Sequence, residues 1–288
     1  MRFVYFGGEP IGVPVLEELK ACRLIPDLVV TSPDRPTGRK QVLTPPPVKV
    51  WAEAHDIPVF QLGGIPKEAT DLGPLTETAW DLFVVVAYNH ILPQWLIDLP
   101  KHQTINLHPS LLPHYRGPSP IRTAILEDNR NSIGVSVMVL DSKMDHGPLL
   151  AQQAQPIADE YWPLDGTELD EALARTGGAL LAHTIPAWVA GEITPIEQDH
   201  SKATYTKKFT RVDGELTIDP MALPRGEAAR QALHTIHAFS GYPETFFIYN
   251  GKRIKILEAD IVEDALNIKT VLPEGKTAMT FETWLKTL

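Results

Sequence analysis

The chain has 288 residues, of which 43% are hydrophobic and 22% are charged. A chain of this length and composition forms one large globular domain or two smaller ones, which excludes global disorder. Its single cysteine, Cys22, excludes an intrachain disulfide framework and any zinc or iron–sulfur site built from several thiolates.

The formal net charge of −10 argues at first against a nucleic-acid partner. The charge is unevenly distributed, however. Residues 201–288 hold 12 basic and 11 acidic side chains, whereas the first 200 residues hold 14 basic and 25 acidic ones. The composition changes around the polar stretch 198–202, and we therefore expect two domains, at 1–200 and 201–288.

No run of about 18 apolar residues is present, so no membrane span is expected. The amino-terminal segment MRFVYFGGEPIG has one arginine and a short apolar run that is broken by glycines and a carboxylate, unlike a signal peptide. We expect a cytoplasmic protein without a membrane partner.

The first domain alternates apolar runs with amphipathic segments. Strands are predicted at 2–6, 28–31, 58–61, 82–87 and 104–107, and helices at 13–22 and 168–189. Runs that are apolar at successive positions are typical of a parallel sheet covered on both faces. The segments 133–140 and 149–157 alternate more and are expected to pair antiparallel at one edge. The pattern predicts an α/β fold with a mostly parallel sheet.

Residues 32–47, SPDRPTGRKQVLTPPP, follow the second predicted strand. Five prolines and two arginines in one connection predict a long exposed loop rather than a helix. Connections of this length in compact domains are commonly functional or disordered.

The second domain has a different pattern. A helix is predicted at 224–239, and Asn250-Gly251 between the apolar runs 245–249 and 252–257 predicts a type I′ hairpin. The segments 268–272 and 278–285 are expected to complete a small β-rich domain.

The densest polar cluster follows the strand predicted at 104–107. Ligands of open parallel sheets bind beyond the carboxyl ends of the strands, and Asn106 and His108 are two residues apart, so they project to the same side. An amide can donate to a developing oxyanion while an imidazole moves a proton, which suits acyl transfer. The residue types alone favour the alternative that Asn106 caps a turn and His108 is an ordinary loop residue, because isolated Asn and His are common in turns.

A second polar segment, DSKMDHGP (141–148), links the two late strands. Asp145 could orient His108 and stabilise an imidazolium, but turn preference alone favours a solvated turn carboxylate before Gly147. The segment GGEPIG (7–12) lacks the order of a dinucleotide-binding loop, and no nucleophile elbow or P-loop is present. Cys22 ends an apolar helical pattern and is predicted to be a core residue. No metal is expected.

The segments INLHPSLLPHYRGPSPI (105–121) and VLDSKMDHGPLL (139–150) resemble the folate-dependent formyltransferases. These enzymes use 10-formyltetrahydrofolate and share an Asn, a His two residues later, an SLLP segment and a downstream Asp. The resemblance implies a Rossmann-like formyltransferase domain in which Asn106, His108 and Asp145 are catalytic.

Further segments resemble the methionyl-tRNA formyltransferase branch of this superfamily, and they lie at 7–19, 33–49, 84–93, 202–218 and 272–285. The resemblance implies transfer of a formyl group from 10-formyltetrahydrofolate to the α-amino group of initiator methionyl-tRNA, for translation initiation. It also implies a tRNA-binding carboxyl-terminal domain of the OB-like barrel type. That domain is expected to be shortened, because the interval between Val262 and Leu272 is shorter than in the family.

A monomer is expected. The resemblance also implies which residues bind the folate and which bind the tRNA. Those for the folate are Tyr88, Asn89, Ile91, Leu92, Ser110, Leu111, Leu112 and Pro113. Those for tRNA are Arg35, Arg39, Lys40, Lys207 and Lys208. Basic side chains neutralise phosphates and release counterions, so local patches can bind tRNA even on an acidic protein. Without the resemblance, Lys207 and Lys208 fit a solvated linker equally well.

Two other functions are compatible with part of the pattern. A sugar-nucleotide N-formyltransferase would share the catalytic trio, but the PDRPTGR loop and the linker resemble the tRNA enzymes instead. A folate- or RNA-binding module without catalysis would need a broken trio, whereas all three residues are present.

Overall fold

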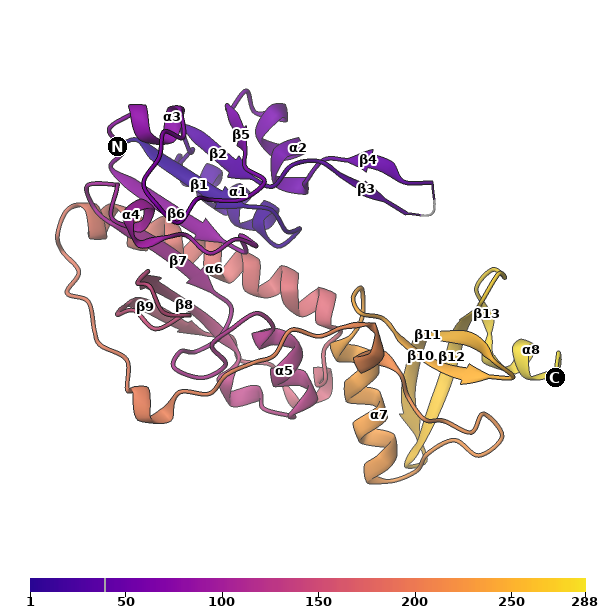
Figure 1. Ribbon diagram of the computed structural model, residues 1–288. Helices are drawn as coiled ribbons and strands as arrows, with labels where there is room; N and C mark the ends of the chain where they lie inside the picture. Colours follow the sequence, from indigo (N-terminus) through magenta and orange to yellow (C-terminus); the bar gives the residue numbers. More distant parts are fainter. Residues whose placement is uncertain (39) are drawn as a thin grey trace. The chain divides into compact units, whose positions relative to one another are not determined.

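The computed structural model describes residues 1–38 and 40–288 and divides them into two compact units, each traced in Figure 1. The N-terminal unit comprises residues 1–116, 133–155 and 171–205. The C-terminal unit comprises residues 117–132, 156–170 and 206–288, so two earlier segments of the chain fold with the last 83 residues.

The N-terminal unit is built on one seven-stranded sheet with the order β5-β2-β1-β6-β7-β8-β9. These strands are β1 (Phe3–Gly7), β2 (Leu28–Thr31), β5 (Val59–Gln61), β6 (Leu82–Val86), β7 (Thr104–His108), β8 (Gly134–Val139) and β9 (Leu149–Ala154). The first five in spatial order pair parallel, while β8 and β9 pair antiparallel at the edge. The predicted mostly parallel sheet and its antiparallel edge are confirmed.

Every residue of β1 and β6 is buried, because helices cover both faces of this sheet. One face packs under α3 (Pro74–Glu77) and α4 (Gln94–Ile97), in a core that includes Phe6 and Phe83. The other face packs under α1 (Gly12–Ala21), α2 (Pro47–Ala54) and α6 (Gly166–Val189). Helix α6 comes so close to β7 that a Cβ on Gly177 would lie 2.6 Å from the Leu107 side chain.

The segment 32–47 differs from the prediction. Instead of an irregular loop, β3 (Arg35–Thr37) and β4 (Val42–Thr44) form an exposed antiparallel hairpin. Each strand of a two-stranded ribbon is an edge strand, so Pro36 does not remove a hydrogen bond that a central strand would need. The β-branched residues of 42–44 favour the extended conformation.

The C-terminal unit holds a four-stranded antiparallel sheet, β10-β11-β12-β13, with a helix packed on it. Its strands are β10 (Thr245–Tyr249), β11 (Lys252–Val262), β12 (Ala265–Pro273) and β13 (Met279–Thr280), and its helices include α5 (Pro120–Leu126), α7 (Glu227–Ala238) and α8 (Phe281–Leu285). Short 3-10 turns lie at Arg130–Ser132, Asp159–Tyr161 and Arg211–Gly214 in this unit, and at His200–Lys202 in the N-terminal unit.

Two tight turns organise this small sheet. Asn250 and Gly251 both have positive φ, at 46° and 72°, as the predicted type I′ hairpin requires. Glu263 and Asp264 also have positive φ and join β11 to β12 directly, which accounts for the short interval before Leu272.

Two local predictions were wrong. Residues 281–285 form α8 rather than a strand, because the Thr280 side chain accepts a hydrogen bond from the Thr283 N–H at 3.2 Å and caps the helix. Cys22 is exposed rather than buried, because it follows the last residue of α1. Within the two described ranges, no helix combines the length and apolar character needed to cross a membrane.

Candidate active site

A polar cluster lies at the carboxyl ends of the central strands. The chain runs from β1 to β2 on one side and later returns to β6 on the other, so the strand order reverses between β1 and β6. Such a reversal is where open α/β sheets bind ligands. Asn106 lies within β7, between Val85 of β6 and Met138 of β8, and is 9% exposed. His108 is the last residue of the same strand.

His108 is held from two sides. Its Nε2 lies 2.9 Å from the carbonyl oxygen of Tyr115, and its Nδ1 lies 3.7 Å from Oδ2 of Asp145. A carbonyl can only accept a hydrogen bond, so Nε2 is assigned the proton, and Nδ1 is the atom that gains or loses one. The side chains of His108 and Asp145 are only 6% and 15% exposed. Asp145 therefore faces the charge that would form on protonated His108.

The loop that carries Asp145 has an unusual backbone. Asp145 has a φ of 48°, a left-handed conformation that aspartate adopts more readily than most residues with a side chain. Two residues later, a Cβ on Gly147 would lie 1.9 Å from the carbonyl oxygen of Val139, so only glycine fits there. The side-chain amide of Gln198 donates to the carbonyl oxygens of Asp145 (3.0 Å) and Gly147 (2.7 Å).

The SLLP turn is tied to the edge of the sheet by a buried hydroxyl. Ser136 of β8 donates to the Ser110 carbonyl at 2.6 Å and accepts from the Leu112 N–H at 3.1 Å. Gln152 of β9 donates to the carbonyl of Leu112 at 2.8 Å. The Leu112–Pro113 peptide bond is cis. The backbone of this turn, which includes Leu111, is thus fixed in one conformation.

The segment after β6 supplies a second polar feature. The hydroxyls of Tyr88 and of Thr31, at the end of β2, are buried and have no hydrogen-bond partner within residues 1–38 and 40–288. Burial raises the pKa of Tyr88 to about 12. An unsatisfied buried hydroxyl costs about 1–3 kcal/mol, so these two groups fit a ligand that carries polar atoms. Thr31 was missed in the sequence, where it only ends an apolar run.

The other folate-binding candidates in this segment differ in environment. Asn89 is exposed and donates to the carboxylate of Glu9, which follows β1. Ile91 is 84% exposed, whereas Leu92 is buried in the core under one face of the sheet. Ile91 is therefore accessible to a ligand, and Leu92 contributes packing.

The predicted tRNA contacts of the N-terminal unit lie on or near the β3–β4 hairpin. Arg35 and Lys40 are exposed, while Arg39 lies outside the described residues. Lys49, at the far end of the same segment, is instead held by Asp34 (2.9 Å) and Gln61. The hydrogen bond from Lys49 lowers the pKa of Asp34.

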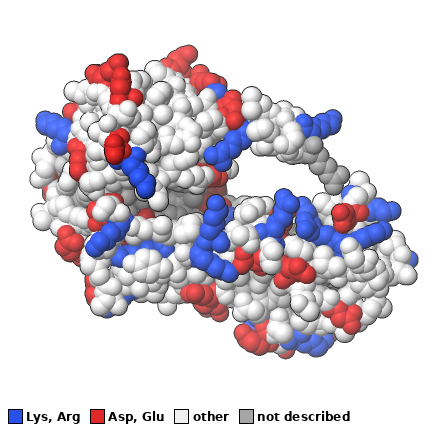
Figure 2. Space-filling view, in the orientation of Figure 1, with Lys and Arg blue, Asp and Glu red and all other residues white. Residues whose placement is uncertain are grey.

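In the C-terminal unit the basic side chains are mixed with acidic ones. Lys207 forms an ion pair with Asp213 at 2.5 Å and lies over the ring of Phe209, while Lys208 is exposed. The hydrogen bond from Lys207 lowers the pKa of Asp213 to about 2. Figure 2 shows lysine and arginine side chains gathered along one edge of this unit, with carboxylates between them.

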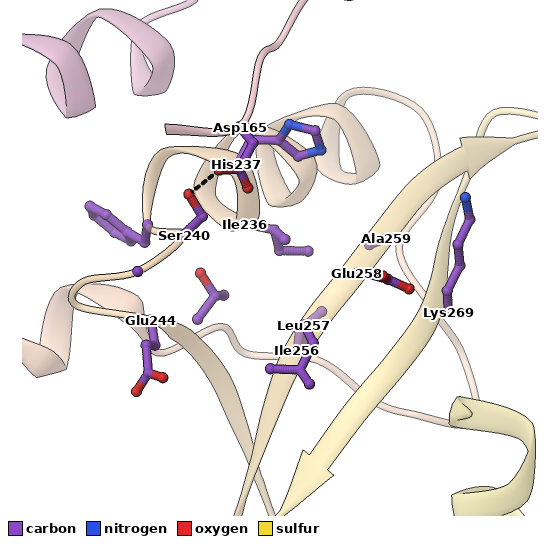
Figure 3. A pocket seen from close by; sticks show the side chains of 13 residues that line it. Asp165, Ile236, His237, Ser240, Glu244, Ile256, Leu257, Glu258, Ala259 and Lys269 are labelled. Carbon is purple, nitrogen blue, oxygen red and sulfur yellow. Dashed lines mark hydrogen bonds between the residues drawn. The ribbon is translucent and has the colours of Figure 1, made fainter. Parts of the chain in front are cut away.

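A cavity of about 430 Å³ opens in the C-terminal unit, next to α7 and β11 (Figure 3). Two of its carboxylates are engaged within the fold, whereas Nδ1 of His237 is buried and has no hydrogen-bond partner among the described residues. Asp165 accepts from the Ser240 hydroxyl at 2.6 Å and from the N–H of Thr167 at the start of α6, while Glu244 pairs with Lys255. The cavity therefore resembles a packing gap around a helix cap more than a reaction site. Among the residues described, no three His, Cys, Asp or Glu side chains gather as metal ligands would.

Comparison with known proteins points to one family. A family model described as formyl transferase matches residues 1–185. The methionyl-tRNA formyltransferase of Halalkalibacterium halodurans is 41% identical over 262 residues, which cover 91% of this chain and 79% of the relative. That of Synechococcus sp. (strain JA-3-3Ab) is also 41% identical over 262 residues, covering 90% and 77%.

The fold recurs in a solved structure. An N-formyltransferase from Helicobacter canadensis, in complex with folinic acid and dTDP-3-aminofucose, superposes with a TM-score of 0.62 over 91% of this chain and 88% of its own. The two chains are 18% identical, so this likeness concerns the fold alone.

Proposed function

The chain belongs to the formyl transferase family, and on that premise we propose that it transfers a formyl group from 10-formyltetrahydrofolate to the α-amino group of initiator methionyl-tRNA. The observation that supports the proposal is the approach of His108 Nδ1 to Asp145 Oδ2 (3.7 Å) at the end of β7, the strand that also carries Asn106. The methionyl-tRNA specificity is supported by the 41% identity over 91% of the chain.

The three side chains suit direct transfer. In the proposed reaction the amine nitrogen attacks the formyl carbon, and the Asn106 amide donates to the oxyanion that develops on the formyl oxygen. His108 accepts the amine proton at Nδ1, where Asp145 compensates the positive charge. The bond from the formyl carbon to the folate nitrogen then breaks, and the proton passes to that nitrogen. The Ser110 hydroxyl donates to the carbonyl of His114 at 2.6 Å, so it is not poised as a nucleophile.

The folate would bind between the segment after β6 and the SLLP turn. We assign the polar contacts to backbone groups of 110–113 and to the hydroxyls of Tyr88 and Thr31, which have no hydrogen-bond partner among the described residues. The fixed backbone of the turn suits this role, because its N–H and C=O groups are already oriented before the ligand arrives.

The tRNA would be held by basic side chains of both units, among them Arg35, Lys40, Lys207 and Lys208. We propose that residues 201–288 form the tRNA-binding domain and that its four-stranded sheet belongs to an OB-like barrel. This stretch carries 12 basic and 11 acidic side chains, so it repels the phosphates of a nucleic acid less than the acidic first 200 residues do. The same proposal makes the protein a monomeric cytoplasmic enzyme of translation initiation.

The deciding experiment supplies the purified protein with 10-formyltetrahydrofolate and three acceptors: initiator methionyl-tRNA, the same tRNA without methionine, and an amino-sugar nucleotide. Formylated product is expected on the methionyl-tRNA alone. Product confined to the sugar nucleotide would replace this proposal with a sugar N-formyltransferase.

A further inference from the structure

We propose that Gln198 is a positioning residue, which holds the Asp145 carboxylate opposite His108 and is itself locked by the buried Arg116. This inference rests on the function proposed above, because it gives Asp145 and His108 their catalytic meaning. Gln198 and Arg116 lie outside the trio, and neither touches the reacting atoms in the proposed mechanism.

Both the amide nitrogen and the amide oxygen of the Gln198 side chain have hydrogen-bond partners. The residue is 5% exposed, and its Nε2 donates to the carbonyls of Asp145 and Gly147. Its Oε1 accepts from Nε (3.2 Å) and from a terminal nitrogen (2.6 Å) of Arg116. Turning the amide over would place its oxygen against two carbonyls and its N–H groups against a guanidinium, so one orientation is strongly preferred.

Arg116 provides the fixed end of this arrangement. It is 1% exposed and is among the largest fully buried side chains of the described residues. A guanidinium keeps its proton in proteins, so a buried one has to be surrounded by acceptors. Besides Gln198, it meets Nδ1 of His200 at 2.8 Å and the Tyr205 hydroxyl at 3.2 Å. These contacts immobilise the guanidinium and, through it, Gln198.

The position of the Asp145 carboxylate depends on the conformation of its turn. Asp145 has a φ of 48°, in the left-handed region, where aspartate occurs more often than most residues with a side chain. Gln198 binds the carbonyl of Asp145 itself and that of Gly147, which brackets the turn from both sides. Release of these bonds would allow the turn to relax and would move the carboxylate away from Nδ1 of His108.

The same stretch of chain also holds the other side of His108. Thr204 accepts from the Tyr115 N–H through its hydroxyl at 2.8 Å, and its carbonyl accepts from the Arg116 N–H at 2.9 Å. The Tyr115 carbonyl is the acceptor for Nε2 of His108. Residues 198–205, which we call the strap, thus fix the partner of each imidazole nitrogen.

The test variant is Gln198→Glu, which keeps the acceptor for Arg116 and the size of the side chain but removes both N–H donors. Since misplacement by about 1 Å can cost 10²-fold in rate, kcat is expected to fall about 10- to 100-fold while KM for the folate stays within about twofold. Thr194→Glu adds the same charge at an exposed position nearby and is the matched control, with unchanged kcat. A folded Gln198→Glu protein with wild-type kcat would overturn the proposal.

A double-mutant cycle separates positioning from a general structural effect. If Gln198 acts through Asp145, then adding Gln198→Glu to Asp145→Asn costs less than twofold further, because the carboxylate it positions is already lost. A full 10- to 100-fold further loss would show that Gln198 acts by another route and would overturn the proposal. Should Gln198→Glu not fold, Gln198→Asn keeps the amide, shortens its reach and carries the same expectations.

One readout does not depend on turnover. The imidazole nitrogen resonances of His108 are expected to shift in Asp145→Asn and in Gln198→Glu, and to stay in place in Thr194→Glu. Unshifted resonances in Gln198→Glu would overturn the positioning role. Failure of the proposed function would be seen separately, as a wild-type protein that does not formylate methionyl-tRNA.

Discussion

His108 and Asp145 come from different elements, the end of β7 and the turn between β8 and β9, yet Nδ1 of one lies 3.7 Å from Oδ2 of the other. With Nε2 committed to the Tyr115 carbonyl, this approach leaves a single nitrogen for proton transfer and places a carboxylate beside it. The pairing leads to a direct test of the trio.

Replacement of His108 or Asp145 tests proton transfer. Because a positioned acid–base group contributes about 10²–10⁴ in rate, His108→Ala is expected to lower kcat by that order, and Asp145→Asn to lower it in the same direction. The double variant should be little slower than His108→Ala alone, since the two act as a unit. Asp56→Asn is the matched control, because Asp56 is also a left-handed aspartate (φ 56°) but is exposed. Multiplicative losses in the double variant would contradict the pairing.

Replacement of Asn106 tests the oxyanion contact. Removal of one oxyanion donor typically costs about 10²–10³ in kcat, so Asn106→Ala should lose turnover by that order while the Kd for the folate changes little. Single-turnover kinetics and equilibrium folate titration measure the two effects separately. Asn131→Ala, at an exposed site, should leave both unchanged. A near-wild-type rate for Asn106→Ala would remove the residue from the mechanism.

Tyr88 tests the folate pocket. The buried hydroxyl has no partner within the described ranges, so Tyr88→Phe should leave the stability at pH 7 unchanged or slightly higher. Loss of one hydrogen bond should weaken folate binding by about 0.5–1.5 kcal/mol, or roughly 2- to 13-fold in Kd. Tyr161→Phe, in which an exposed hydroxyl is removed, should bind like wild type. Equal Kd values for the two variants would exclude Tyr88 from the pocket.

The lysines of the linker test tRNA contact. Each phosphate contact that is removed should reduce the slope of log K against log salt by about one. Lys208→Ala is expected to show this reduction, and Lys207→Ala a smaller one because Lys207 is already paired with Asp213. Lys286→Ala, which removes an exposed lysine paired with Glu282, is the control. An unchanged slope for Lys208→Ala would show that the residue does not touch the tRNA.

The contact between Lys49 and Asp34 predicts a pH effect on stability. Lys49 lowers the pKa of Asp34 below its ordinary value, so between the two pKa values the folded chain binds fewer protons than the unfolded one. The contribution is therefore present above the ordinary carboxyl pKa and is lost as the pH falls through the lowered one. Lys49→Met should show a smaller loss in urea midpoint between pH 7 and pH 3 than wild type. An identical loss would show that the contact does not contribute.

The sheet was predictable because burial on both faces requires its strands to be apolar at successive positions, and this pattern is visible in the sequence. Residues 82–86 are apolar at every position, and only a strand covered on both faces buries all of them. The hairpin at 35–44 was not predictable from its prolines, since a proline disrupts a central strand but not an edge.

The candidate site was predictable in part. Asn106 and His108 were candidates because of their place at the end of a strand, whereas the choice of Asp145 as the partner of His108 over a solvated turn carboxylate depended on family resemblance, because no local pattern brings two distant segments together. The burial of Arg116 and Thr31 arises from long-range packing. An arginine is ordinarily exposed, and the sequence around residue 116 does not indicate that residues 198–205 supply hydrogen-bond acceptors for it.

The strap has a consequence for building hybrid enzymes. The family match ends at residue 185, which makes the following stretch an obvious place to splice on a different RNA-binding module. Yet Gln198 and Thr204, which hold the partners of His108, come after that point. A splice between 186 and 197 would replace Gln198 and Thr204 with foreign residues, whereas a splice after Tyr205 would keep them but would separate residues 117–132 and 156–170 from the stretch 206–288 with which they fold.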